Sequence, residues 1–285
     1  MKYNRILTIQ DISCLGQCSM TVALPILSAC GQETCIIPSA VLSTHTGGFQ
    51  KPHIRDISMD IPDISAHWGR EGVDFDAIYT GYLGSTQQIG YVADIFAETA
   101  AEGCIKVVDP AMADNGKLYP AFDMAYVEAM KRLCAAADYL LPNVTEACFL
   151  TGIEYREEYD EAYIQKLMTA LHKLGAKNII LTGVGFHTAQ TGVMISESGV
   201  QSYYCHRRLS ENCHGTGDVH ASAFVGALMK DLDAYTAAKI AADYTLLCME
   251  NTRGDKDHTY GVKFEPMLGT LMDMIRIARK RAVRD

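Results

Sequence analysis

Short β-like runs alternate with longer helical patterns along almost the whole chain, and this alternation restricts the fold more than anything else in the sequence. It predicts an α/β fold with a mainly parallel central sheet and helices on both faces. Two late runs, 192–195 and 200–204, are separated by a short turn-like segment and predict an antiparallel hairpin. The other expected strands are 6–9, 35–37, 77–79, 105–108, 139–141 and 178–181, and the expected helices are 19–29, 86–102, 123–137, 160–174, 218–230, 233–250 and 265–282.

The chain carries no Pro/Gly/Ser-rich linker, low-complexity segment or internal repeat, so a single domain over residues 1–285 is expected. Its least regular stretch, about 43–72, contains Gly47-Gly48, Pro52 and Pro62 and is interpreted as a small lid or a loop-rich excursion. A second polar loop, about 111–121, suits a flap that excludes water from a reaction, although an ordinary surface loop fits the same residues.

The composition excludes several classes of partner. A formal net charge of −9 argues against nucleic acid or an anionic membrane surface. No run approaches the ~18 apolar residues of a membrane span. The ten cysteines are scattered without a C-x-x-C pair, which favours reduced thiols over disulfides or a zinc site. We therefore expect a cytoplasmic protein that binds small molecules.

The segment Gly215-Thr216-Gly217-Asp218 opens an apolar, helix-forming run. Free backbone N–H groups at a helix N-terminus bind anions, whereas the carboxylate of Asp218 would repel them. Both features fit one chemistry if Asp218 takes a proton from a hydroxyl while the amides hold a phosphoryl group in transfer. A glycine-rich turn with a capping Asp is the structural alternative. The chain has no G-x-x-x-x-G-K-[ST] segment, so any nucleotide use is not of the P-loop type.

Polar side chains also follow two predicted strands, at the edge of the sheet where ligands bind in folds of this class. Asp109 follows the strand 105–108, and Asn143 and Glu146 follow the strand 139–141. Asn143 and Glu146 are three residues apart, so on a helix they would face the same point. They could hold a hydrated Mg²⁺ or form a capping box, and the spacing fits both.

Two further segments, 43–48 and 80–85, are polar and contain glycine where a strand should end. They supply hydroxyl groups, the imidazole of His45 and the ring of Tyr82, which suit a small, flat, polar ligand. A lone histidine is also a common structural residue, so His45 has both interpretations.

The five segments described above, taken in their order along the chain, resemble motifs of the ribokinase superfamily, and more narrowly of its pyridoxal kinase branch. The resemblance extends from about Ile6 to Leu228 and implies a three-layer α/β/α ribokinase-like fold. It also implies transfer of the γ-phosphate of ATP to the 5′-hydroxymethyl group of pyridoxal, pyridoxine or pyridoxamine, with Mg²⁺, a monovalent cation such as K⁺, and a homodimer. The motifs are Ser43-Thr44-His45-Thr46-Gly47, Thr80-Gly81-Tyr82-Leu83-Gly84-Ser85, Asp109-Pro110-Ala111-Met112-Ala113-Asp114, Pro142-Asn143-Val144-Thr145-Glu146 and Gly215-Thr216-Gly217-Asp218.

The resemblance also implies roles for individual residues. Asp218 would be the general base, and the amides of Gly215, Thr216 and Gly217 would form the anion hole. Metal and its waters would be organised by Asn143, Glu146 and Asp109. The part of the site that binds ATP would further include Asp114, Tyr119 and Thr182. The part that binds the vitamer would include Asp11, His45, Thr46 and Tyr82.

One departure concerns Asp11, which stands where many pyridoxal kinases have a serine that touches the substrate ring. A carboxylate there could favour another ring protonation state or an amine-bearing vitamer. A hydroxymethylpyrimidine kinase of the same fold is the main alternative, although some dual-specificity members of that group have a cysteine where this chain has Asp218. A sugar kinase is third, because residues 11–19 lack a glycine-rich sugar-binding segment. A non-catalytic pyridoxal or nucleotide sensor is the alternative from another class.

Overall fold

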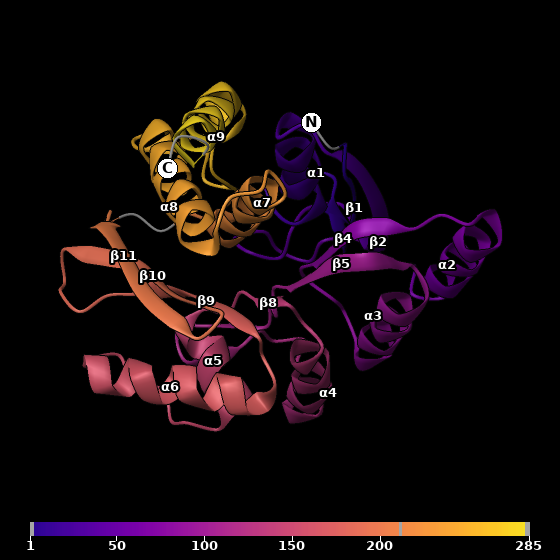
Figure 1. Cartoon of the computed structure of the whole chain (residues 1–285), viewed down its shortest axis with the longest axis horizontal. Helices are drawn as coiled ribbons and strands as arrows, with labels where there is room; N and C mark the ends of the chain where they lie inside the picture. Colours follow the sequence, from indigo (N-terminus) through magenta and orange to yellow (C-terminus); the bar gives the residue numbers. More distant parts are fainter. Residues whose placement is uncertain (1–2, 211–212, 283–285) are drawn as a thin grey trace. The chain divides into compact units, whose positions relative to one another are not determined.

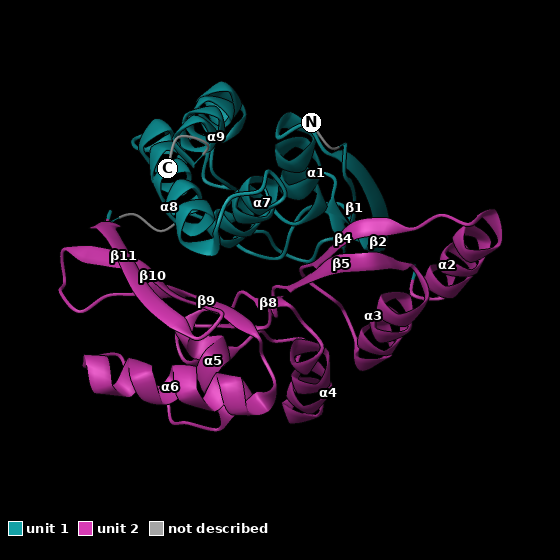
Figure 2. Ribbon diagram, viewed as in Figure 1, with its two compact units in different colours: residues 1–57, 209–285 teal, residues 58–208 magenta. Residues whose placement is uncertain are grey.

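The computed structural model describes residues 3–210 and 213–282, and the chain forms two compact units (Figures 1 and 2). Unit 1 consists of residues 1–57 and 209–285, and unit 2 of residues 58–208. Each unit combines strands with helices, as predicted for an α/β protein. The expected domain limits at residues 1 and 285 lie outside the described residues, and a single functional domain stays a prediction.

Unit 1 contains three strands of the sheet. β1 (Arg5–Ser13) pairs in parallel with β2 (Glu33–Leu42), and β3 (Ile54–Asp56) is antiparallel to β2. The predicted strands at 6–9 and 35–37 are thus the centres of longer strands. Ile6, Leu7 and Ile9 are fully buried. Successive residues of β1 therefore have both faces covered, which is typical of a parallel strand.

The helices of unit 1 are α1 (Met20–Ala29), α7 (Thr216–Leu228), α8 (Ala234–Thr252) and α9 (Leu268–Ala282), with the short 3₁₀ turn η1 (Glu265–Met267) before α9. A glycine allows α1 and α7 to pack closely: a Cβ on Gly226 would lie 2.5 Å from Cys30 Sγ. All residues of α7 from Val219 to Leu228 are buried. The hydrophobic core of unit 1 therefore fixes the position of this helix.

Unit 2 contains the strand order β11-β10-β9-β8-β5-β4. β4 (Phe75–Thr80), β5 (Ala100–Val108), β8 (Tyr139–Leu140) and β9 (Asn178–Val184) are parallel. β10 (Gln190–Glu197) and β11 (Val200–Arg207) form the predicted antiparallel hairpin, which turns at Ser198 and Gly199 with positive φ at both. Such a turn matches the right-handed twist of the strands that it joins.

The helices of unit 2 are α2 (Asp60–Glu71), α3 (Thr86–Glu98), α4 (Met124–Ala135), α5 (Val144–Thr151) and α6 (Glu161–Leu174). In Figure 2, α3 to α6 lie on one side of the strands of this unit. Four of these helices begin at a residue whose side chain accepts a backbone N–H of the first turn, namely Ser85, Asp123, Asn143 and Asp160. Among the described residues, no helix is both long and apolar enough to cross a membrane.

Two expectations about local structure differ from the structure. The helix predicted over 86–102 ends at Glu98, and Ala100 already pairs with Phe75 at the start of β5. Sheet pairing thus overrides the helix propensity of this segment. The irregular stretch 43–72 contains β3 and the helix α2. Pro62 does not prevent that helix, because it lies in the first turn, where no intrahelical N–H is needed.

The packing of α2 rests on an aromatic contact inside unit 2. Trp68 lies edge-on to Phe75 of β4 with ring centroids 5.4 Å apart, and Phe75 is 1% exposed. We expect Phe75→Ala to lower the free energy of unfolding by about 3–5 kcal/mol, because it leaves a cavity in a packed core. Met59→Ala is the control, since Met59 is 72% exposed and its truncation should stay within about 0.5 kcal/mol. Urea unfolding followed by circular dichroism measures both, and equal midpoints would contradict the prediction.

Candidate active site

The N-terminus of α7 in unit 1 has the form expected of an anion site. Gly215 is its N-cap, with φ 77°, and the first N–H that the helix uses is that of Val219, which donates to the Gly215 carbonyl at 3.0 Å. The four preceding N–H groups therefore have no partner within the helix. A Cβ on Gly215 would lie 1.9 Å from the Gln17 carbonyl oxygen, whereas one on Gly217 would meet nothing within 4 Å. The two glycines thus differ: Gly215 permits a close backbone approach, and Gly217 borders open space.

Asp218 lies at the third position of α7 and is half-buried. Burial raises the pKa of its carboxyl to about 7; a hydrogen bond from the Ser19 backbone N–H lowers this pKa, and the charge of Asp11 raises it further. A carboxylate with a pKa near 7 is a far better proton acceptor than an ordinary surface aspartate. Asp218 and the amides of residues 215–217 therefore share one turn of helix, as the sequence suggested.

Asp11 of β1 is close to this turn. It is 4% exposed, and burial raises the pKa of its carboxyl although the hydroxyls of Ser19 and Ser13 both donate to it. The Ser13 Oγ lies 3.3 Å from Asp11 Oδ2. Cys18 is near both carboxylates, and burial together with their charges raises the pKa of its thiol. Asp11, Cys18, Ser19 and Asp218 therefore form one cluster in unit 1.

His45 uses both ring nitrogens within unit 1. Its Nδ1 accepts the Gly47 N–H at 3.1 Å, and its Nε2 lies 2.6 Å from the Tyr260 carbonyl oxygen, so the proton of a neutral ring is on Nε2. The ring is 5% exposed. The structural interpretation of His45 thus accounts for its polar atoms, and a role in ligand binding stays a prediction. Thr46, next to it, is exposed.

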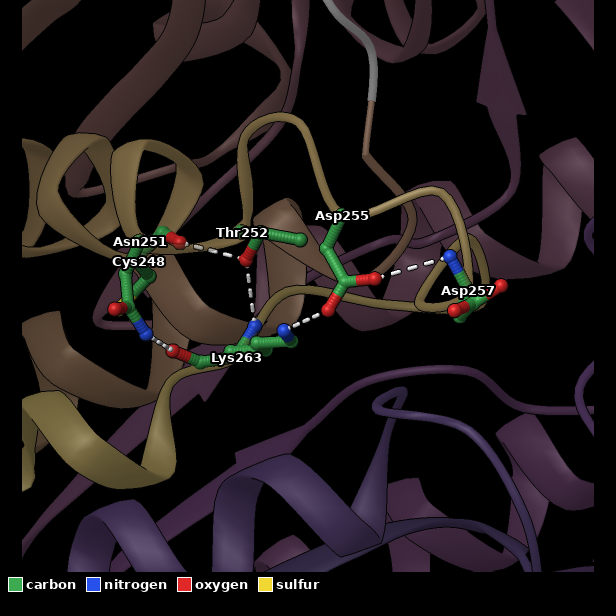
Figure 3. A network of polar contacts seen from close by, with 6 residues as sticks. All are labelled: Cys248, Asn251, Thr252, Asp255, Asp257 and Lys263. Atoms are coloured by element: carbon green, nitrogen blue, oxygen red, sulfur yellow. Dashed lines mark hydrogen bonds and ion pairs between the residues drawn. The ribbon is translucent and has the colours of Figure 1, made fainter.

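The loop after α8 that contacts His45 is held by a network of polar groups (Figure 3). Thr252 Oγ1 donates to the Cys248 carbonyl at 2.8 Å and accepts the Lys263 N–H at 2.8 Å. The Lys263 ammonium pairs with Asp255, which lowers the pKa of that carboxyl, and Asp255 also accepts the Asp257 N–H at 3.0 Å. The loop is thereby closed at its base, which positions the Tyr260 carbonyl for His45.

In unit 2, Asn143 and Glu146 form the capping box that the sequence left open. Asn143 Oδ1 accepts the Glu146 N–H at 2.9 Å, and Glu146 Oε2 accepts the Asn143 N–H at 2.8 Å. Glu146 Oε1 accepts the Met112 N–H at 2.9 Å, and Asn143 Nδ2 donates to the Ala113 carbonyl at 2.8 Å. The pair therefore also holds the segment that follows β5. A metal role for either side chain stays a prediction.

Glu146 is 3% exposed, and burial raises the pKa of its carboxyl to about 7 although several backbone N–H groups donate to it. The charge of Asp114 adds to this increase. Asp109, at the end of β5, accepts the Ala111 N–H at 3.1 Å through Oδ1. Glu146 and Asp109 both raise the pKa of the buried Cys134 thiol, so they lie in the same region of unit 2.

The predicted flap is a small hairpin, β6 (Ala113–Asp114) and β7 (Lys117–Leu118), which turns at Asn115 and Gly116. Both carboxylate oxygens of Asp114 accept hydrogen bonds from Asn115, at 2.9 and 3.0 Å. The Gly116 N–H donates to Thr145 Oγ1 of α5 at 3.1 Å. The tip of this hairpin is therefore attached to the helix that carries Glu146.

The remaining predicted residues of unit 2 occupy two places. Thr182 of β9 lies beside Asn143, and both its N–H and its hydroxyl donate to the Pro142 carbonyl, at 2.9 and 3.3 Å. Tyr82 belongs to an aromatic group with Phe122, at a centroid distance of 5.4 Å. Phe122 in turn stacks on Tyr126 at 3.8 Å, and Tyr119 lies 6.4 Å from Phe122. The ring of Tyr82 is thus linked to the end of the flap.

The donor set of unit 2 fits a hydrated Mg²⁺. Among the residues that the structure describes, no three His, Cys, Asp or Glu side chains gather as a closed metal site. Mg²⁺ does not need such a cage, since it keeps several waters and binds through one or two carboxylates plus substrate phosphates. A buried carboxyl with a raised pKa, such as that of Glu146, is one whose ionised form a nearby cation would favour.

Sequence reasoning missed several residues that shape these groups. Ser19 contacts two predicted site carboxylates, Phe122 supports Tyr82, and Thr145 holds the flap. Thr145 lies inside a motif that was noted, but Ser19 and Phe122 have no sequence signal, because their partners are distant along the chain.

The predicted residues fall into two groups: unit 1 carries Asp11, His45, Thr46, Gly215, Thr216, Gly217 and Asp218, and unit 2 carries Tyr82, Asp109, Asp114, Tyr119, Asn143, Glu146 and Thr182.

Comparison with known proteins identifies the class. Residues 26–262 match the phosphomethylpyrimidine kinase family. Pyridoxal kinase from Dictyostelium discoideum is 30% identical over 206 residues, which cover 69% of this chain and 65% of that protein. The chain thus matches less than two thirds of that relative's length.

Two solved structures are similar over nearly their whole length. Pyridoxal kinase from Lactobacillus plantarum is 31% identical with a TM-score of 0.88, covering 96% of this chain and 98% of that one. A Bacteroides thetaiotaomicron protein, provisionally a phosphomethylpyrimidine kinase and crystallised with pyridoxal, is 33% identical with a TM-score of 0.89, covering 95% and 96%.

The chain therefore belongs to the phosphomethylpyrimidine kinase family. Its similarity to pyridoxal kinases in sequence and structure confirms the predicted pyridoxal kinase branch of the ribokinase superfamily and the ribokinase-like α/β fold.

The two glycines of the α7 N-terminus should respond differently to alanine. Gly215→Ala should lower the free energy of unfolding by about 1–3 kcal/mol, because it forces an alanine to positive φ against the Gln17 carbonyl. Gly217→Ala should change it by no more than about 0.5 kcal/mol, since its Cβ meets nothing. Thermal unfolding of both variants measures the difference, and equal stability would mean that Gly215 is not constrained as described.

Proposed function

We propose that this protein phosphorylates the 5′-hydroxymethyl group of a vitamin B6 vitamer, using ATP and Mg²⁺. The observation that carries the proposal is Asp218, a half-buried carboxyl with a pKa of about 7 in the same helical turn as backbone N–H groups that have no partner within the helix. A proton acceptor beside an anion hole is what phosphoryl transfer to an alcohol requires. Membership of a kinase family supports the same reaction.

In this mechanism the alcohol oxygen attacks the γ-phosphorus of ATP while Asp218 accepts the proton of the alcohol. The bond from the γ-phosphorus to the β,γ-bridging oxygen breaks, and ADP leaves. The N–H groups of Gly215, Thr216 and Gly217 donate to the phosphoryl oxygens and stabilise the charge that they carry in the transition state. Mg²⁺, when bound, would neutralise part of the charge on the phosphates. The waters of Mg²⁺ would be oriented by Glu146, Asn143 and Asp109. The part of the site that binds ATP would also include Asp114, Tyr119 and Thr182.

On the substrate side, Asp11, Thr46 and Tyr82 would contact the pyridine ring or its substituents, with His45 as support for the loop. The pyridoxal kinase relatives support a vitamer as substrate. A homodimer and a monovalent cation such as K⁺ remain parts of the proposal that rest on the family resemblance.

A hydroxymethylpyrimidine kinase is the second candidate. The family description and the provisional assignment of the Bacteroides protein favour it, whereas the pyridoxal in that crystal favours a vitamer. Both substrates are flat heteroaromatic alcohols, so the same base and anion hole would serve either.

A comparison of substrates tests the choice. We expect kcat/KM for the best of pyridoxal, pyridoxamine and pyridoxine to exceed that for hydroxymethylpyrimidine by on the order of tenfold or more, since the two rings differ in their polar groups. Coupled ADP release with purified protein, ATP and Mg²⁺ measures each. A preference for hydroxymethylpyrimidine would select the second candidate, and calorimetric binding of a vitamer without turnover would indicate a sensor.

Asp218→Asn should lower kcat by about 10²–10⁴-fold with the fold intact, the usual effect of removing a positioned base. The native enzyme should gain activity as the pH rises through about 7, because only the ionised form of Asp218 accepts a proton. The variant should lack this dependence. Asp273→Asn, an exposed aspartate of α9 in the same unit, is the matched control and should keep full activity. Unchanged turnover of Asp218→Asn would reject Asp218 as the base.

A further inference from the structure

The peptide group directly after Tyr82 is fixed from both sides in unit 2. It joins Leu83, which is fully buried, to Gly84, and neither residue belongs to a helix or strand. The Tyr126 hydroxyl donates to the Leu83 carbonyl at 2.7 Å, and the Gly84 N–H donates to Gln88 Oε1 at 2.6 Å. The carbonyl and the N–H of a trans peptide point in opposite directions. Two side chains therefore fix the plane of this one peptide group.

Gln88 reaches beyond the helix to which it belongs. It is the third residue of α3, three positions after the N-cap Ser85, as in a capping box, where the glutamine would accept the N–H of the cap residue. Gln88 Oε1 accepts the N–H of Gly84, one residue earlier. Its Nε2 donates to Ser58 Oγ at 2.7 Å, and the residue is 1% exposed. The bond to Ser58 thus orients the amide so that its oxygen faces Gly84.

Tyr126 of α4 supports Tyr82 in two ways. Its hydroxyl fixes the carbonyl of the next residue along the chain, Leu83. Its ring stacks on Phe122 with centroids 3.8 Å apart, and Phe122 lies 5.4 Å from the ring of Tyr82. Tyr126 is 3% exposed, whereas Tyr82 is only half-buried. A buried residue therefore supports both the backbone and the ring of a partly exposed one.

We propose that Gln88 and Tyr126 are positioning residues that set the orientation of Tyr82 by fixing the peptide group after it. The contact of Tyr82 with the vitamer ring rests on the proposed function. The inference deepens that function by naming two buried residues that act on vitamer affinity through Tyr82. A ring that is already oriented loses less freedom when a ligand binds, so the affinity is higher.

Nuclear magnetic resonance of the free protein tests the orientation without any substrate. In Gln88→Ala we expect the Gly84 amide to exchange with solvent about tenfold faster or more, because its acceptor is gone. Tyr126→Phe removes only the hydroxyl and keeps the ring that stacks on Phe122. In both variants the ring signals of Tyr82 should move, since each frees one side of the same peptide group.

Calorimetric titration with pyridoxal tests the consequence for binding. We expect Kd to rise about three- to tenfold in Gln88→Ala and in Tyr126→Phe, the scale of one lost hydrogen bond. The affinity for ATP with Mg²⁺ should stay as in the native protein, because the stack of aromatic rings that leads to the flap is kept. In a Tyr82→Ala background neither change should weaken pyridoxal binding further, since both act through Tyr82.

Gln87→Ala and Tyr163→Phe are the matched controls. Gln87 is the exposed neighbour of Gln88 on α3. Tyr163 lies in the same unit, is 7% exposed, and donates its hydroxyl to a backbone carbonyl, that of Glu154, at the same distance of 2.7 Å. Both controls should keep the native ring signals of Tyr82 and the native affinity for pyridoxal.

Three results would overturn the proposal. They are unchanged Tyr82 ring signals in Gln88→Ala and Tyr126→Phe, a ring that moves without any loss of pyridoxal affinity, and a further loss of affinity in the Tyr82→Ala background. If the native protein binds no pyridoxal, the proposed function fails, while the resonance data still decide whether Gln88 and Tyr126 position Tyr82.

Discussion

The proposed chemistry depends on the N-terminus of α7, because one turn of this helix brings together a carboxylate and N–H groups that have no partner within the helix. Its position is set by packing on both sides. The rest of the helix is buried from Val219 to Leu228. At its start Gly215 lies so close to the Gln17 carbonyl that no side chain would fit. Packing therefore holds this turn of helix in place, and groups fixed in this way are what electrostatic stabilisation of a transition state requires.

Both units hold a carboxyl whose pKa burial raises to about 7, Asp218 in unit 1 and Glu146 in unit 2. In the unfolded chain such groups titrate near about 4, so between about pH 4 and 7 the folded protein binds more protons and loses stability as the pH rises. Carboxyls that oppose folding at neutral pH in this way are concentrated at functional sites. In the proposed reaction, proton acceptance would give Asp218 such a use, and a nearby cation would do so for Glu146.

The parts of the fold that could be predicted are those determined locally. Apolar runs located the strands, and the spacing of Asn143 and Glu146 indicated the start of α5. The end of α3 could not be predicted, because Ala100 leaves a helix-forming segment to pair with Phe75. In the site, the G-T-G-D turn was evident from its glycines, whereas the hydrogen bonds of His45 to Tyr260 and of Ser19 to Asp218 join distant segments. No periodicity or local motif encodes such contacts.

Backbone strain supplies a signal that the sequence lacks. Ser19 and Ala111 both have positive φ, 54° and 33°, although neither is glycine. Each donates its backbone N–H to a carboxylate predicted for the site, Ser19 to Asp218 in unit 1 and Ala111 to Asp109 in unit 2. Residues held in such conformations persist where the surrounding structure imposes them, often beside functional groups. In both units, therefore, the backbone N–H of a residue with positive φ helps to hold one of these carboxylates.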